Sequence, residues 1–136
     1  MLEKLTRLVV GGQAGVVHDA TAALQECFVA CTQRVQQLGR HAEMAPQEYA
    51  AAGLHALAAA EEKQAERLRD ALRAAGVAPV APASESPTMG ALNHWARLVH
   101  DLEAHRVSAR RLRELAVHFA ESLPNTAALF DELCRE

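Results

Sequence analysis

Residues 50–75 carry an apolar stripe that two polar residues interrupt. The stripe residues follow one another at spacings of three and four, which is the pattern of a helix packed in a bundle. They are Ala50, Leu54, Leu57, Glu61, Gln64, Leu68, Ala71 and Ala75. At such inward positions Glu61 and Gln64 are costly to bury unless neighbouring groups form hydrogen bonds with them. The pattern therefore predicts helices that surround a polar pair in the interior of a bundle.

The composition predicts an all-α chain that forms one domain over residues 1–136. Half of the residues are apolar but only 4% are aromatic, and β-branched runs that predict strands are nearly absent. The formal net charge of −3 argues against nucleic-acid binding through phosphate neutralisation. No apolar run approaches the roughly 20 residues of a membrane span. The three cysteines, an odd number without a framework spacing, indicate reduced thiols and a cytoplasmic protein.

Glycines divide the N-terminal part of the chain. Gly11 and Gly12 each cost about 1 kcal/mol in a helix interior, so we expect a short helix over residues 2–10 and then a long one. The long helix is expected to end at Gly39. Its apolar stripe consists of Ala20, Leu24, Cys27, Cys31, Val35 and Leu38. The two stripe cysteines, four residues apart on one helix, are expected to be buried and unlinked.

Prolines and a further glycine divide the remainder. Pro46 suits the first residue of a second long helix, and Gly76 suits its C-terminal stop. The linker 76–87 contains three prolines and is longer than a tight helical hairpin needs, since in extended form it reaches about 35 Å. We therefore expect it to cross over along the bundle, so that a helix over residues 88–122 runs parallel to the second one. A short last helix is expected over residues 126–134.

The helix expected over residues 88–122 has the most regular stripe in the chain. Its positions are Ala91, Trp95, Leu98, Leu102, His105, Ala109, Leu112, Ala116, Phe119 and Leu123. His105 is the one polar residue among them. Because Glu61 and His105 both occupy inward positions on long helices, we expect their side chains to approach each other inside the bundle.

The run AAEEKQAERLRDAL resembles the second helix of rubrerythrin-type ferritin-like proteins, in which a run of the form E-E-x-x-H-A-E supplies ligands to a di-iron site. Glu61 matches the glutamate of that run, residues 65–66 match its end, and Gln64 stands in place of the histidine. The long crossover also resembles the ferritin-like fold. No second E-x-x-H run is present. The resemblance thus implies an up-down ferritin-like bundle that is degenerate at the di-iron site.

Two interpretations of the polar positions remain open. The first is a buried hydrogen-bond network of Glu61, Gln64 and His105 that sets the helix register. The second is a site for iron or another transition metal, with Glu61 and His105 as ligands. Glu103 and Glu26 would add carboxylates to it from matching levels of their helices. We expect no other cofactor.

His100 raises a different class of function. An exposed histidine in mid-helix, within H-D-L, is typical of histidine phosphotransfer domains, which are also helical bundles. Glu103 stands where such domains place a cation, and an acid there repels a phosphoryl group. Neither a nucleophile elbow nor a glycine-rich phosphate loop is present. We therefore expect a protein that is not an enzyme, with phosphotransfer at His100 as one alternative.

The lengths of the expected helices predict self-association. A closed four-helix bundle needs four helices of similar length, and this chain is predicted to have three long helices and a short last one. The long stripes would remain uncovered over part of their length, and large exposed apolar patches are unusual on monomers. We expect a two-fold homodimer with a structural or partner-binding role.

Overall fold

Four helices form the described part of the chain. The computed structural model describes the backbone of residues 2–82 and 93–136, and the side chains of residues 14–82 and 93–136. The helices are α1 (Leu2–Met44), α2 (Glu48–Ala74), α3 (His94–His118) and α4 (Pro124–Arg135). The described backbone contains no strand, so the all-α prediction is confirmed. No helix among the described residues combines the length and the apolar character that crossing a membrane requires.

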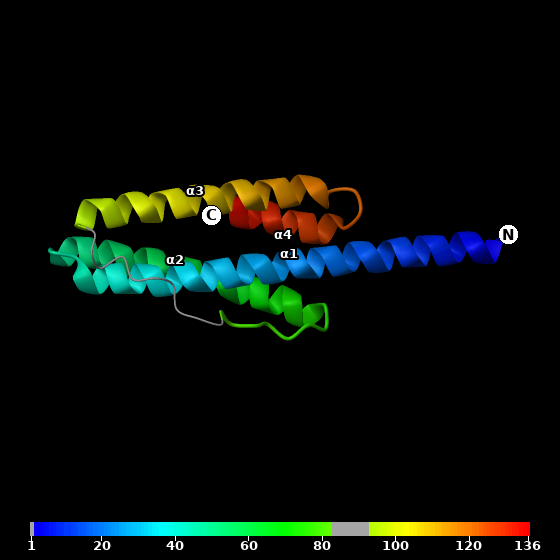
Figure 1. Cartoon of the computed structure of the whole chain (residues 1–136), viewed down its shortest axis with the longest axis horizontal. Coiled ribbons are helices and arrows are strands. Elements are labelled where there is room, and N and C mark those ends of the chain that lie inside the picture. The colour runs from blue at the N-terminus through cyan, green and yellow to red at the C-terminus, as the bar shows by residue number, and fades with distance from the viewer. Residues whose placement is uncertain (1, 83–92) are drawn as a thin grey trace.

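The helices pack as two pairs, α1 with α2 and α3 with α4, and α1 also packs against α3. Figure 1 shows that α2 returns antiparallel to α1, whereas α3 starts at the end where α2 starts and runs parallel to it. The parallel direction is the one that the long linker predicts. The short α4 returns antiparallel to α3 and covers only part of the length of the bundle. The N-terminal part of α1 extends past the other helices (Figure 1).

Several predicted boundaries are wrong. The backbone stays helical through Gly11 and Gly12, and α1 also passes Gly39 to reach Met44. A glycine costs only about 1 kcal/mol, which is less than the hydrogen bonds lost when a helix is interrupted. Residues after Gly39 also pack into the bundle, because His41 and Ala42 are buried.

The start of α2 and both ends of α3 differ from the prediction as well. Pro46 precedes the helix, because the first helical residue is Glu48. The predicted start of the third long helix, Thr88, lies outside the described residues. The helix is observed from His94, where the Asn93 side chain accepts a hydrogen bond from the Ala96 N–H at 2.8 Å. It ends at His118 and not at residue 122.

Proline and glycine do end or start helices where their backbone geometry requires it. Pro124 is the first residue of α4, two residues before the predicted start at residue 126. Gly76 has a φ of 77°, and it ends α2 as predicted. The Gly76 N–H donates to the Arg73 carbonyl and the Val77 N–H donates to the Leu72 carbonyl, which is the Schellman arrangement.

The main core lies where α4 packs against the other helices. Its largest fully buried side chains are Phe130 and Leu72, joined by the buried Phe119. The predicted α1 stripe is confirmed at five of its six positions, since Ala20, Leu24, Cys27, Cys31 and Leu38 are buried. A second, smaller cluster consists of Leu38, Ala42 and Leu54.

The predicted inward stripes fail in the half of the bundle that α4 does not reach. Leu57 is 56% exposed, Trp95 is 74% exposed and Leu102 is 50% exposed. The reason is the length of α4, which has 12 residues against 27 in α2 and 25 in α3. Without a fourth helix to cover them, Leu57 of α2 and Leu102 of α3 are exposed in this half, whereas Leu54 is buried against α1.

Candidate functional site

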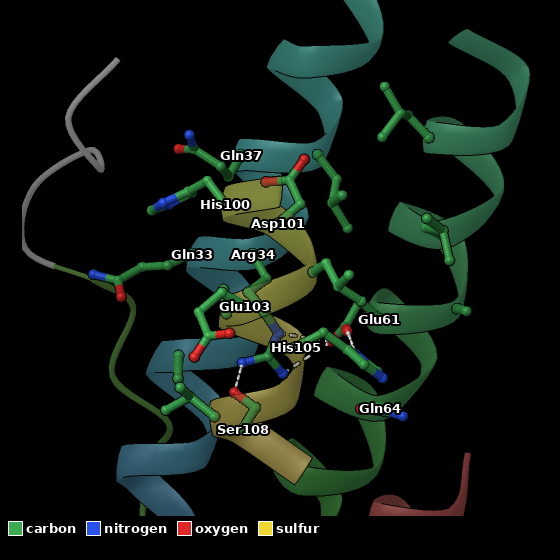
Figure 2. A pocket seen from close by; sticks show the side chains of 18 of the residues that line it. Gln33, Arg34, Gln37, Glu61, Gln64, His100, Asp101, Glu103, His105 and Ser108 are labelled. Carbon is green, nitrogen blue, oxygen red and sulfur yellow. Dashed lines mark hydrogen bonds and ion pairs between the residues drawn. The ribbon is translucent and has the colours of Figure 1, made fainter. Parts of the chain in front are cut away.

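A groove lies between α2 and α3 in the half that α4 leaves open, and its cavity has a volume of about 710 Å³. Leucines at positions 54 and 57 of α2 and 98 and 102 of α3 line it, and residues of α1 contribute to it as well. Glu136, which follows the last residue of α4, also borders the groove. The groove is therefore the apolar space that a longer fourth helix would occupy. Figure 2 shows the polar side chains that α1, α2 and α3 bring to its inner wall.

Glu61 is the most connected polar residue of the groove, and it is only 7% exposed. Its Oε2 atom accepts hydrogen bonds from Arg34 Nε at 3.2 Å and from Arg34 Nη2 at 3.0 Å (Figure 2). The Cys31 thiol donates to the same oxygen at 3.3 Å. Arg34 also donates to the hydroxyl of Ser108 on α3. The Arg34–Glu61 ion pair thus joins α1 to α2, and Arg34 links both to α3.

The surroundings of Glu61 favour its ionised form. Burial by itself disfavours the charge, but the hydrogen bonds and the positive charge of Arg34 outweigh it, so the pKa of Glu61 is lowered. Burial raises the pKa of the neighbouring Cys31 to about 12, although the charge of Arg34 acts in the opposite direction. At neutral pH the pair is therefore a carboxylate and a guanidinium beside a protonated thiol, which is an unreactive combination.

His105 meets Glu61 at the mouth of the groove. The distance from His105 Nδ1 to Glu61 Oε1 is 3.5 Å, and the His105 side chain is 56% exposed. The two residues approach each other as expected, but His105 lies in the surface and not inside the bundle. Gln64 is buried and turns to α4 instead, where its Nε2 atom donates to the Leu133 carbonyl at 3.5 Å.

Sequence reasoning missed the principal partners of Glu61. Arg34 lies beside the apolar stripe of α1, three residues after Cys31, and a long basic side chain at such an edge reads as solvent-exposed. Cys31 was predicted to be buried, but its hydrogen bond to a carboxylate depends on the α1–α2 register. The one signal in the sequence that could have predicted this ion pair was the position of Arg34 on its helix, near the level of the inward-facing Glu61 and Gln64.

The remaining candidate metal ligands divide between two places. Glu103 borders the same groove as Glu61 and His105. Glu26 borders a separate cavity of about 460 Å³ between α1 and α3, and it forms an ion pair with Arg111 at 3.2 Å. Among the side chains of residues 14–82 and 93–136, no group of three or more His, Cys, Asp or Glu is placed to hold a metal ion.

A second polar cluster, which the sequence did not predict, joins α1 to α3 beside the groove. His41 is 1% exposed, and its Nδ1 atom lies 2.5 Å from Asp101 Oδ2. Its Nε2 atom lies 2.9 Å from Gln37 Nε2. The tautomer that satisfies both contacts has Nδ1 donating to the carboxylate and Nε2 accepting from the amide. His100, the candidate phosphate acceptor, is exposed next to this cluster.

No protein-family model, curated protein or solved structure matches the chain. The chemical character of the groove is therefore inferred from the residues that line it. The carboxylate of Glu61 is already bound by Arg34, and that of Asp101 is already bound by His41. The exposed apolar residues of the groove are Leu57, Leu102 and Val107 among its large side chains, and His100, Glu103 and His105 are exposed at its border.

Proposed function

We propose that this protein is a non-enzymatic helical bundle with a structural, partner-binding role, and that the partner is a second copy of the chain bound over the groove. The observation that carries the proposal is the unclosed half of the bundle, where Leu57 and Leu102 border an open groove. Burial of this surface by a partner stabilises an assembly by about 25 cal/mol per Å².

The exposed area fits a dimer. Tyr49, Leu57, Trp95, Val99 and Leu102 are between 49% and 76% exposed. Their exposed surfaces sum to on the order of 700 Å², and Leu57 and Leu102 among them border the groove. A standard interface buries about 800 Å² on each partner, so this surface supplies most of what one interface requires.

The helix order supports the finer proposal of a ferritin-like bundle that is degenerate at the di-iron site. Three features support it: the long crossover, the parallel direction of α2 and α3, and the inward positions of Glu61 and Gln64. In this proposal the guanidinium of Arg34 supplies the positive charge that balances Glu61, and the ion pair replaces metal coordination as the link between helices.

Metal binding is the second candidate: Glu61, His105 and Glu103 border one groove, although within the described side chains they do not form a group of three placed to hold a metal ion. The ion pair with Arg34 opposes it, since a metal ion would have to displace a guanidinium that holds Glu61 Oε2 by two hydrogen bonds. We expect the purified protein to contain no stoichiometric transition metal by elemental analysis. One equivalent of iron or zinc that is lost in a Glu61→Gln variant would favour the metal-binding function instead.

Phosphotransfer at His100 is the third candidate, and its exposure makes it sterically accessible. Glu103 and Asp101 place two acids within one turn of it, which disfavours an incoming phosphoryl group. We expect no phosphohistidine after incubation with a phosphorylated response regulator. Labelling that a His100→Gln variant abolishes would support the phosphotransfer function.

Light scattering tests the dimer directly. We expect a mass near twice the 14.7 kDa of the chain, and a Leu57→Glu variant that shifts towards the monomer because it places a charge in the interface. Val117→Glu is the matched control, because Val117 is 75% exposed on α3 and does not border the groove. A monomer mass for the unaltered protein at all accessible concentrations would exclude the proposal.

A further inference from the structure

Trp95 is a large exposed side chain three residues before Leu98, which lines the groove. It is the only tryptophan in the chain and is 74% exposed in the first turn of α3. The Asn93 cap fixes the start of that helix. Val99 and Leu102 follow at spacings of four and three, and they are 49% and 50% exposed. The three side chains therefore form one exposed apolar stripe on α3, and Leu102 at its end also borders the groove.

We propose that Trp95 anchors the association of two copies, with the α3 helices packed antiparallel about a two-fold axis between positions 98 and 99. This inference rests on the proposed homodimer and specifies its contact surface. Each Trp95 then packs against Leu102 of the partner subunit, at the edge of the partner's groove.

The spacing of the stripe supports a second copy over an unrelated partner. Under an antiparallel two-fold, position 95 pairs with position 102, and position 98 pairs with position 99. Trp95 and Leu102 therefore exchange places under this two-fold, as a closed isologous interface requires, whereas Val99 meets Leu98, which is partly buried against the smaller core cluster. An apolar residue meets an apolar residue at each of these pairs, since the four positions are Trp95, Leu98, Val99 and Leu102.

The flanking charges agree with the same register. Glu103 pairs with position 94, so its carboxylate lies opposite His94 of the partner subunit. Asp101, whose pairing position holds Ala96, keeps its contact with His41. Position 100 pairs with position 97, so the exposed His100 lies opposite Arg97, which is buried within its own chain, and no two acidic residues face each other at the paired positions 94–103. A tryptophan that becomes buried contributes about 150–250 Å² of contact, and such residues are the commonest interface hot spots.

The single tryptophan reports on its own burial. We expect its fluorescence emission to shift to shorter wavelength, and acrylamide quenching to decrease, as the protein concentration rises through the dimerisation range. We expect Trp95→Ala to raise the dimer Kd by about tenfold or more. Val117→Ala, an exposed position on the same helix, is the control and is expected to leave the Kd unchanged.

An exchange of side chains tests the specific contact. Trp95→Leu alone brings two leucines together at each contact, and Leu102→Trp alone brings two tryptophans together. Both single variants are expected to weaken the dimer. The double variant restores one tryptophan and one leucine at each contact, so it is expected to recover most of the affinity. Circular dichroism before each measurement checks that the helices are intact.

The outcomes separate the two proposals. If the protein dimerises but acrylamide still quenches Trp95 at all concentrations, the Trp95 anchor is wrong and the homodimer stands. The same conclusion follows if the loss of dimer affinity in the double variant equals the sum of the losses in the single variants. A monomer at all concentrations would overturn both.

Discussion

The two halves of the bundle contain the same three long helices, yet they differ in what covers the apolar stripes. Where α4 is present, Phe130, Leu72 and Leu68 are at most 2% exposed. Where α4 is absent, Leu57 and Leu102 occupy equivalent stripe positions and are at least half exposed. A regular apolar stripe therefore indicates which face of a helix is suited to packing, but not whether another helix will cover that face.

The largest expected effect is the difference in stability between two alanine substitutions, one in each half of the bundle. Phe130→Ala should destabilise the fold by about 3–5 kcal/mol, because it leaves a cavity in a closed core. Leu102→Ala should change the stability of the monomer by less than about 0.5 kcal/mol. Urea unfolding of dilute samples measures both. Equal losses would show that the half without α4 is closed in solution.

The Arg34–Glu61 pair lies at the boundary between the halves, and its loss should have the next largest effect. Glu61→Ala leaves Arg34, whose side chain is 15% exposed, without its carboxylate and should cost about 2–4 kcal/mol. The double variant Arg34→Met, Glu61→Leu removes both charges and should recover much of that loss. If the double variant were as unstable as the sum of the single ones, the pair would not be coupled.

The same pair should make stability depend on pH. The pKa of Glu61 is lowered from its ordinary value of 4.5, so the ionised form stabilises the fold fully above that value. This contribution is lost as the pH falls through the lower, folded-state pKa. The urea midpoint of the unaltered protein should therefore fall more steeply below pH 4.5 than that of Glu61→Gln. Parallel curves for the two proteins would contradict the assignment.

The smallest expected effects are differences in reactivity among the three thiols, which labelling rates measure. Burial raises the pKa of Cys27 to about 11 and that of Cys31 to about 12, so both should react slowly with a thiol reagent at pH 8. Cys134, which is partly exposed near the end of α4, should react first. A Cys27→Ser, Cys31→Ser variant with an unchanged fast phase would assign that phase to Cys134. Rapid native labelling of Cys31 would indicate that α1 and α2 separate readily.

Some of the site followed from the sequence and some did not. Glu61 and Gln64 were predicted to be inward-facing because their positions continue an apolar stripe, and both are buried. The partners of Glu61 could not be predicted, since Arg34 and Cys31 reach it through an inter-helix register that no local pattern encodes. The His41–Asp101 contact joins residues 60 positions apart and was missed for the same reason.

The helical class, the glycine stop at Gly76 and the inward face of α1 could all be predicted from the sequence, because they depend on backbone preferences and on side-chain spacing within one segment. The tertiary structure decided which stripes became core. Trp95 on α3 and Phe119, the residue that follows α3, belong to the one stripe predicted for the third long helix, yet the first is 74% exposed and the second is 3% exposed. The physical reason is that burial requires a second surface, and α4 supplies that surface to only one end of the helix.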